Sequence, residues 1–158
     1  MNPLEYVIVK KLSKRDKWSL WGSLESYINH ITKHGFKIKL IRVDGEGATQ
    51  TEWFESRISE LGIVLDIIGA GEAVSVVERK IRHVKDSGRA VIKTLQYSLT
   101  EKLEGWFVRY VVNRIVHVPT SNTVKYVCSR EKLHGRKLNF DKELKHGMGD
   151  NVQVHADR

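Results

Sequence analysis

Apolar side chains recur along the first half of the chain with two periods, the two-residue period of a strand and the 3.6-residue period of a helix. Residues 4–12 are rich in β-branched and aromatic side chains and predict a strand. Helical spacing over residues 18–34 predicts the first helix. Residues 36–43 begin in period two, with lysines on the opposite face, and predict a second strand that ends at Asp44.

The same pattern continues in the second half of the chain. Residues 50–61 place apolar side chains on one helical face, and residues 63–68 are a short apolar run typical of a buried strand. A long helix is predicted over residues 74–95, and a further helix over residues 99–116 ends before Pro119. This order of strands and helices predicts an α/β layer whose later strands are mostly parallel.

The length of 158 residues allows one domain with a tail. We expect a core at residues 1–119, followed by a polar C-terminal extension at residues 120–158 that leads into a following domain. No apolar run is long enough to cross a membrane, and the first residues do not form a secretory signal. We therefore expect a nuclear or cytoplasmic protein that is not secreted and does not bind to a membrane.

Charge narrows the class of partner. Lysine and arginine total 27 against 19 acidic residues, which gives a formal charge of +8 and favours a polyanionic partner, with nucleic acid first. The single cysteine, Cys128, excludes an internal disulfide and a cysteine-rich zinc site, and we expect it to be packed and inert.

Two carboxylates are predicted near the edge of an α/β sheet at which functional residues commonly lie. Asp44 ends a predicted strand before a Gly-rich turn, and Glu78 lies in the first turns of the long predicted helix, with 33 residues between the two acids. One helix and one strand fill that interval, so both acids can reach the same sheet edge. Paired carboxylates there suit Mg²⁺, which takes hard oxygen ligands. The alternative is that both are ordinary exposed acids.

The long predicted helix also carries a basic face. A core stripe is predicted for Val77, Ile81, Val84, Gly88 and Val91, and Gly88 indicates close approach by another element. Beside that stripe we expect Glu78 as a metal ligand, followed by DNA-binding side chains at Arg79, Lys80, Arg82, Lys85 and Arg89. The alternative is a solvated face on which Glu78 pairs with Arg82.

Other conspicuous residues favour structural roles. The four tryptophans, Trp18, Trp21, Trp53 and Trp106, occur at helical spacings and are expected in the core. Asp66 lies within an apolar strand, where a paired acid is more common than a metal ligand.

Four segments, in this order, resemble the integrases of copia-type retrotransposons. They are IRVDGEGATQTEWFESRISELGI, VVERKIRHVKDSGRAVI, WFVRYVVNRIVHVP and SREKLHGRKLNFDKELKHGMGDNVQVH. The resemblance extends over nearly the whole chain. It implies an RNase H-like mixed sheet flanked by helices, and a D-D-E site that binds two Mg²⁺ or Mn²⁺ ions. Such a site processes the 3′ ends of element DNA and joins them to a target duplex, and these enzymes can form homo-oligomers.

By this resemblance Asp44 is the second acid of the site and Glu78 the third, and Arg82 and Lys85 match positions that contact DNA. The residue after Asp44 is glycine, where the family commonly has asparagine. The first acid of the family belongs on a strand before residues 4–12, so the resemblance implies a fragment of a Pol polyprotein that lacks its first strand. Such a fragment is expected to be catalytically incomplete. The alternative is a non-catalytic nucleic-acid-binding domain derived from a retroelement.

Overall fold

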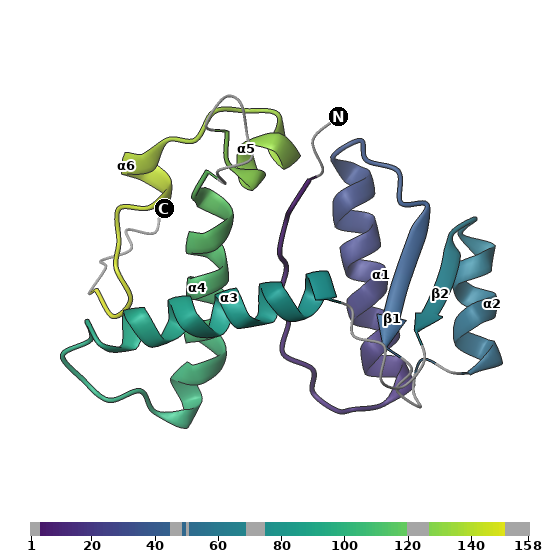
Figure 1. Cartoon of the computed structure of the whole chain (residues 1–158), viewed down its shortest axis with the longest axis horizontal. Coiled ribbons are helices and arrows are strands. Elements are labelled where there is room, and N and C mark those ends of the chain that lie inside the picture. Colours follow the sequence, from purple (N-terminus) through teal and green to yellow (C-terminus); the bar gives the residue numbers. More distant parts are fainter. Residues whose placement is uncertain (1–3, 45–48, 50, 69–74, 120–126, 151–158) are drawn as a thin grey trace, which may run out of the picture. The chain divides into compact units, whose positions relative to one another are not determined.

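The computed structural model describes residues 4–44, 49, 51–68, 75–119 and 127–150. The chain forms two compact units (Figure 1). Residues 8–83 make up the first, here called the sheet unit, and residues 1–7 with 84–158 make up the second, here called the helical unit.

The described part of the sheet unit contains two helices and two strands before the third helix begins. They are α1 (Lys17–Lys33), β1 (Leu40–Asp44), α2 (Glu52–Glu60) and β2 (Val64–Ile68). The strands pair in parallel, with Leu40 opposite Val64 and Asp44 opposite Ile68. The parallel pairing confirms the predicted α/β order, although β1 begins four residues later than the pattern at residues 36–43 predicts.

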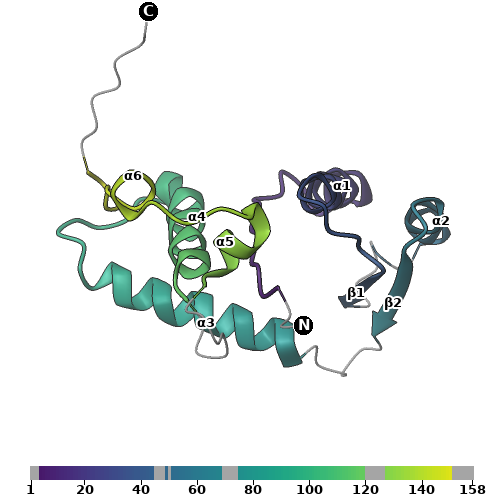
Figure 2. The same ribbon diagram turned by 90° about the horizontal axis from the view of Figure 1, so that it is seen from above.

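Both helices of the sheet unit cover the same face of the two strands (Figure 2). Ile28 of α1 and Phe54 and Ile58 of α2 are buried together with Ile63, and Ile41 of β1 packs against them. Side chains alternate along a strand, so the residues next to Ile41 point to the opposite face. The sheet therefore has one apolar, helix-covered face and one face that carries Arg42 and Asp44.

Side-chain caps begin both helices of this unit. Oδ1 of Asp16 accepts a hydrogen bond from the backbone N–H of Ser19 (2.7 Å), and the hydroxyl of Thr51 accepts one from Phe54 (3.3 Å). These bonds satisfy N–H groups that the first helical turn leaves without partners. Gly62 lies just beyond the end of α2, and its φ of +67° is a conformation that glycine adopts without strain.

The strand predicted at residues 4–12 is absent from the structure, where this stretch is described but forms no ladder. Its β-rich composition was the only local signal, and a strand also needs a neighbour to receive its backbone hydrogen bonds. One of its carbonyl groups, that of Glu5, accepts instead from the hydroxyl of Ser129 (2.8 Å) within the helical unit.

The α3 helix (Ser75–Ile92) belongs to the sheet unit up to His83 and to the helical unit from Val84. In the helical unit it is followed by α4 (Glu101–His117). Gly88 confirms the predicted close approach, because a Cβ atom there would lie 3.5 Å from Cε1 of the Phe107 ring on α4. The predicted core stripe is correct only in this half of α3.

Two short helices lie in the stretch that the sequence predicts to be a polar extension: α5 (Ser129–His134) and α6 (Phe140–Glu143). Cys128 caps α5 through its sulfur atom, and the Glu131 carboxylate accepts in return from the Cys128 N–H (3.1 Å). The thiol is buried, as expected, and that burial raises its pKa. The division at residue 119 into a core and an extension stays a prediction.

Ion pairs of Glu143 connect α6 to other parts of the helical unit. The carboxylate of Glu143 pairs with Arg130 of α5, with Arg136 (3.3 Å) and with the buried ring of His117 at the end of α4 (3.8 Å). Burial would raise the pKa of Glu143, but the charges of Arg130 and Arg136 outweigh it and hold the pKa below its ordinary value. These ion pairs therefore join α6 to α5 and to the end of α4.

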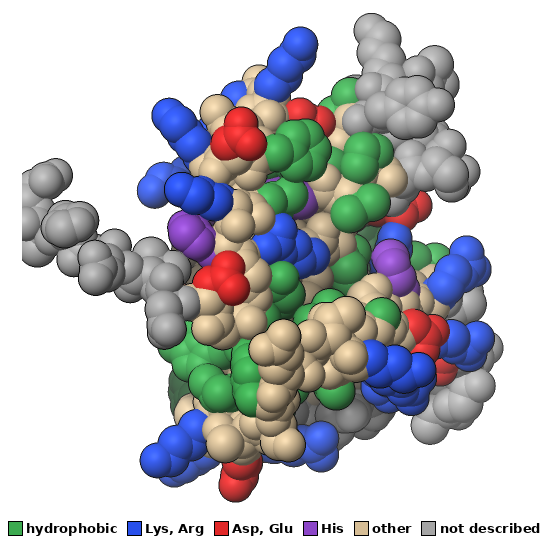
Figure 3. Space-filling model, turned by 90° about the vertical axis from the view of Figure 1, so that its left-hand side faces the viewer, with side chains coloured by type: hydrophobic (Ala, Val, Ile, Leu, Met, Phe, Trp, Pro, Cys, Tyr) green, Lys and Arg blue, Asp and Glu red, His purple; other side chains and the backbone are tan. Residues whose placement is uncertain are grey.

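Several apolar side chains remain exposed among basic ones, as one face of the molecule shows (Figure 3). They include Trp106 and Val118, which are 63% and 60% exposed. Among the described residues no helix combines the length and the apolar character that crossing a bilayer requires.

The core of the sheet unit gives a test of this packing. Ile58 has no exposed surface, so Ile58→Ala should lower the free energy of unfolding by about 2–5 kcal/mol. Leu61→Ala, at the half-exposed end of the same helix, is the matched control and should cost about 1 kcal/mol or less. Urea denaturation measures both, and equal losses would contradict the placement of Ile58.

Candidate nucleic-acid interface

Asp44 is the last residue of β1, and its side chain is exposed. Its backbone carbonyl accepts a hydrogen bond from the hydroxyl of the buried Thr49 (2.9 Å). That bond ties the chain beyond the strand back to the strand end. The Gly-rich turn predicted after Asp44 falls on residues 45–48, which lie outside the described residues.

Glu78 lies in the first turn of α3, where the helix dipole favours an acidic side chain. It is exposed, and no ion pair between Glu78 and Arg82 is present among the described residues. Residues 69–74, between β2 and α3, lie outside the described residues. The convergence of Asp44 and Glu78 at one sheet edge stays a prediction.

The basic face of α3 is exposed along Arg82, Lys85 and Arg89. These residues and Glu78 recur at three- and four-residue spacing and share one side of the helix. Arg89 also pairs with Asp86 through a 2.8 Å contact between Nη1 and Oδ1, in which both side chains are mostly exposed. A pair this exposed is weak and leaves the guanidinium available to another anion.

Two features of α3 differ from the sequence prediction. Lys80 is half-buried and lies on the side of the helix away from Glu78, so it does not join the basic face, whereas Arg79 is exposed. Val77 and Ile81, predicted as core, are each 49% exposed. Helical spacing identifies a face of the helix but does not show where along the helix a neighbouring element covers it.

Two further acids, Asp66 and Asp16, have other partners in the structure. Asp66 pairs with Arg42 across the open face of the sheet (Oδ2 to Nε, 2.7 Å), as the paired-acid interpretation predicted. Asp16 caps α1, and the hydrogen bond from the Ser19 N–H lowers the pKa of its carboxyl. Within the described stretches no group of three or more His, Cys, Asp or Glu side chains is placed to hold a metal ion.

The exposed carboxylates of Asp44 and Glu78 are hard oxygen donors of the kind that Mg²⁺ and Mn²⁺ accept. Two carboxylates suffice for one such ion, which keeps several of its waters. Two ions about 4 Å apart need more oxygen donors than this pair supplies. By donor count alone, Asp44 and Glu78 would serve one divalent ion at most.

Comparison with known proteins gives a structural likeness. No family model and no curated protein sequence matches the chain. A chain of the solved simian T-cell lymphotropic virus intasome, in complex with the PP2A regulatory subunit B56 gamma, matches it with a TM-score of 0.58 and 14% sequence identity. The match covers 92% of this chain and 47% of that chain, so the present chain spans about half the length of its structural neighbour. At this identity the likeness shows the fold alone.

The pair formed by Arg42 and Asp66 gives a test of the open sheet face. Their side chains are 53% and 40% exposed, so a double-mutant cycle with Arg42→Ala and Asp66→Ala should yield a coupling of only about 0.2–1 kcal/mol. Thermal or urea unfolding of the four proteins measures it. A coupling well above that range would mean that this face is covered.

Proposed function

We propose that the chain is an integrase-type module of a retroelement that binds duplex DNA, including element ends and target, along the basic face of α3. The observation that carries the proposal is the likeness over nearly the whole chain to a chain of a retroviral intasome. The sequence resemblance to copia-type integrases points in the same direction and implies the RNase H-like fold. The proposal places such a module on DNA in the nucleus or cytoplasm. It also includes the association of several copies of the chain into a homo-oligomer.

The charge of α3 supports a phosphate contact. Arg82 and Arg89 are seven residues apart, which is about 10 Å along a helix at 1.5 Å per residue. Duplex DNA carries one phosphate for about every 1.7 Å of its axis, so a helix face of this length meets several phosphates. Contacts of this kind hold DNA without reading its sequence.

Asp44 and Glu78 would hold a divalent cation in this proposal. The cation supplies Lewis-acid polarisation of a phosphodiester, while the carboxylates fix its position and the basic face holds the DNA strand. Because the donor set fits one ion, we expect the 158-residue chain to bind DNA and metal without completing 3′-end processing or strand transfer.

A second candidate function is a nucleic-acid-binding domain that has no catalytic role. The engagement of Asp66 by Arg42 favours it, because that acid shares the open sheet face with Asp44 and is held away from metal binding. The two candidates differ in one respect: only the first requires a cation at Asp44 and Glu78.

Duplex binding tests the DNA proposal. Arg82→Ala with Lys85→Ala should weaken binding to duplexes of any sequence and reduce the salt slope of log affinity by about two, because two phosphate contacts are lost. The control, Lys39→Ala with Lys102→Ala, removes the same charge from exposed positions outside α3 and should leave the slope near that of the wild type. Fluorescence anisotropy at several salt concentrations measures both, and an unchanged slope in the α3 variant would remove this face from the DNA contact.

Metal binding separates the two candidate functions. Titration with Mn²⁺, followed by electron paramagnetic resonance, should show weak binding that Asp44→Asn and Glu78→Gln each abolish. Asp86→Asn removes an acid from the same helix and should have no effect. If all three variants bind Mn²⁺ as the wild type does, the non-catalytic function holds. Strand transfer by the wild-type chain with Mn²⁺ would show that a third acid takes part.

A further inference from the structure

An exposed tryptophan stands at the start of α1. Trp18 is 62% exposed, although its helical spacing predicts a core position. Trp21 and Trp53 do pack against the core of the sheet unit. The indole ring of Trp18 therefore presents apolar surface to solvent, while the neighbouring rings of Trp21 and Trp53 are partly buried.

Ring contacts fix the position of Trp18. Its ring centroid lies 4.7 Å from that of Trp53 at an interplanar angle of 64°, and the Trp53 ring meets Trp21 at 5.8 Å and 75°. Edge-to-face contacts of this kind are favourable and hold the rings in defined orientations. Trp18 is thus attached through Trp53 to a buried core, which gives an exposed aromatic surface with little freedom to move.

Two cations accompany these rings. Nζ of Lys17 lies 5.1 Å from the centroid of Trp18 and 5.5 Å from that of Trp53. Cζ of Arg57, on α2, lies 5.8 Å from the Trp53 centroid. Both are within the range of a cation–π interaction. Lys17 places positive charge beside the exposed ring of Trp18, and Arg57 places it beside the neighbouring, half-buried ring of Trp53.

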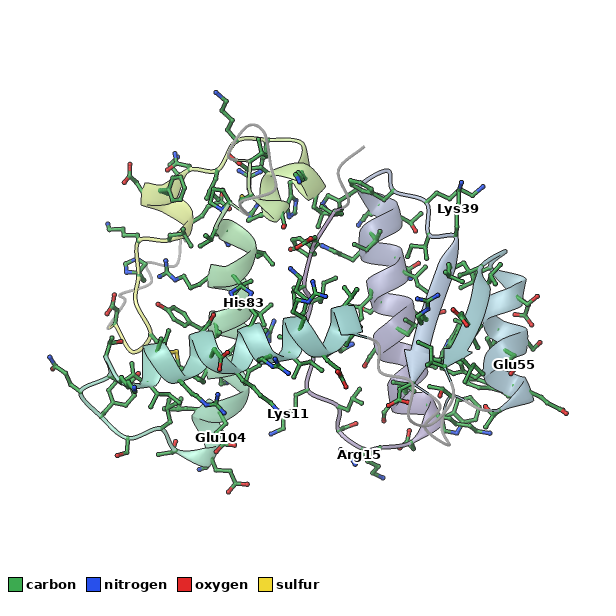
Figure 4. The ribbon with its side chains drawn as sticks, viewed as in Figure 1. Lys11, Arg15, Lys39, Glu55, His83 and Glu104 are labelled. Carbon is green, nitrogen blue, oxygen red and sulfur yellow. The ribbon has the colours of Figure 1, made fainter. Side chains whose placement is uncertain are left out.

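The loop that leads into α1 adds further positive charge. Residues 10–17 read KKLSKRDK, with five basic residues and a single acid. That acid, Asp16, caps α1, so its negative charge lies at the positive N-terminal end of the helix dipole. Arg15 and Lys14 are exposed, and Figure 4 shows Arg15 at the start of α1, on the side where the loop enters the helix. An anion reaching the Trp18 ring therefore meets a positive surface.

We propose that Trp18, supported by Trp53, forms a stacking site for an unpaired nucleobase of single-stranded nucleic acid, with Lys14, Arg15, Lys17 and Arg57 on the adjacent phosphates. An exposed aromatic face beside cations is the combination that single-strand binding uses, because every base has a face to stack and every nucleotide a phosphate. Bases within a duplex are already stacked on their neighbours, so the site selects unpaired nucleotides. This goes beyond the duplex contact of α3, since it uses other elements and another form of nucleic acid.

Substitution of Trp18 tests the stacking site in the full chain. Trp18→Ala should weaken binding of a fluorescein-labelled oligothymidylate about tenfold, the loss typical of one stacked base, and leave duplex binding unchanged. Trp18→Phe keeps an aromatic face and should retain most of the affinity. The matched control is Trp106→Ala, because Trp106 is 63% exposed and also carries a cation, Arg109, 5.2 Å from its ring centroid.

The outcomes separate this inference from the proposed function. Unchanged oligothymidylate binding in Trp18→Ala overturns the stacking site, as does an equal loss in Trp106→Ala or in Trp18→Phe. Arg15→Ala with Lys17→Ala should lower the single-strand salt slope by about 1.4, and no change overturns the phosphate contacts. The α3 variant Arg82→Ala with Lys85→Ala is measured on duplex DNA alone, so its result decides the proposed function independently of Trp18.

Discussion

Two parallel strands in fixed register set the geometry of the sheet unit. Leu40 lies opposite Val64 and Asp44 opposite Ile68, so both strands end together at their carboxyl ends. Because side chains alternate along each strand, this register sends Ile41 to the helix-covered face. A shift of one residue would move Ile41 out of the core and turn Asp44 toward the buried face. Packing of Phe54 and Ile58 of α2 against Ile41 therefore also holds Asp44 at an exposed sheet edge.

Within the described residues, local periodicity was sufficient to predict the four longer helices and β1, because each buries one face and that face repeats at a fixed spacing. The β2 strand was predicted from a short apolar run instead. Prediction from local sequence failed at residues 4–12, where β-rich composition gives no strand without a neighbour. The short helices α5 and α6 have too few turns for a periodic signal, and only their caps at Cys128 and Asn139 mark them.

In the candidate site, too, local features could be predicted from the sequence, whereas contacts between distant residues could not. Gly88 could be predicted as a place of close approach because glycine interrupts an otherwise regular apolar stripe, and Phe107 occupies that place. The sequence predicted that Asp66 would be paired but not that Arg42 would be its partner, because the partner depends on the register of two strands separated in sequence. Trp18 was assigned to the core because its spacing is helical, but spacing does not show where the covering neighbour ends.

The central claim is that the basic face of α3 lies against DNA, and it can be examined by lysine acetylation followed by mass spectrometry. Lys85 and Lys102 are both exposed lysines on helices, and only Lys85 belongs to that face. Saturating duplex DNA should slow acetylation of Lys85 several-fold and leave Lys102 as reactive as in the free protein. Equal acetylation of Lys85 with and without DNA, under conditions where the duplex is bound, would contradict the account.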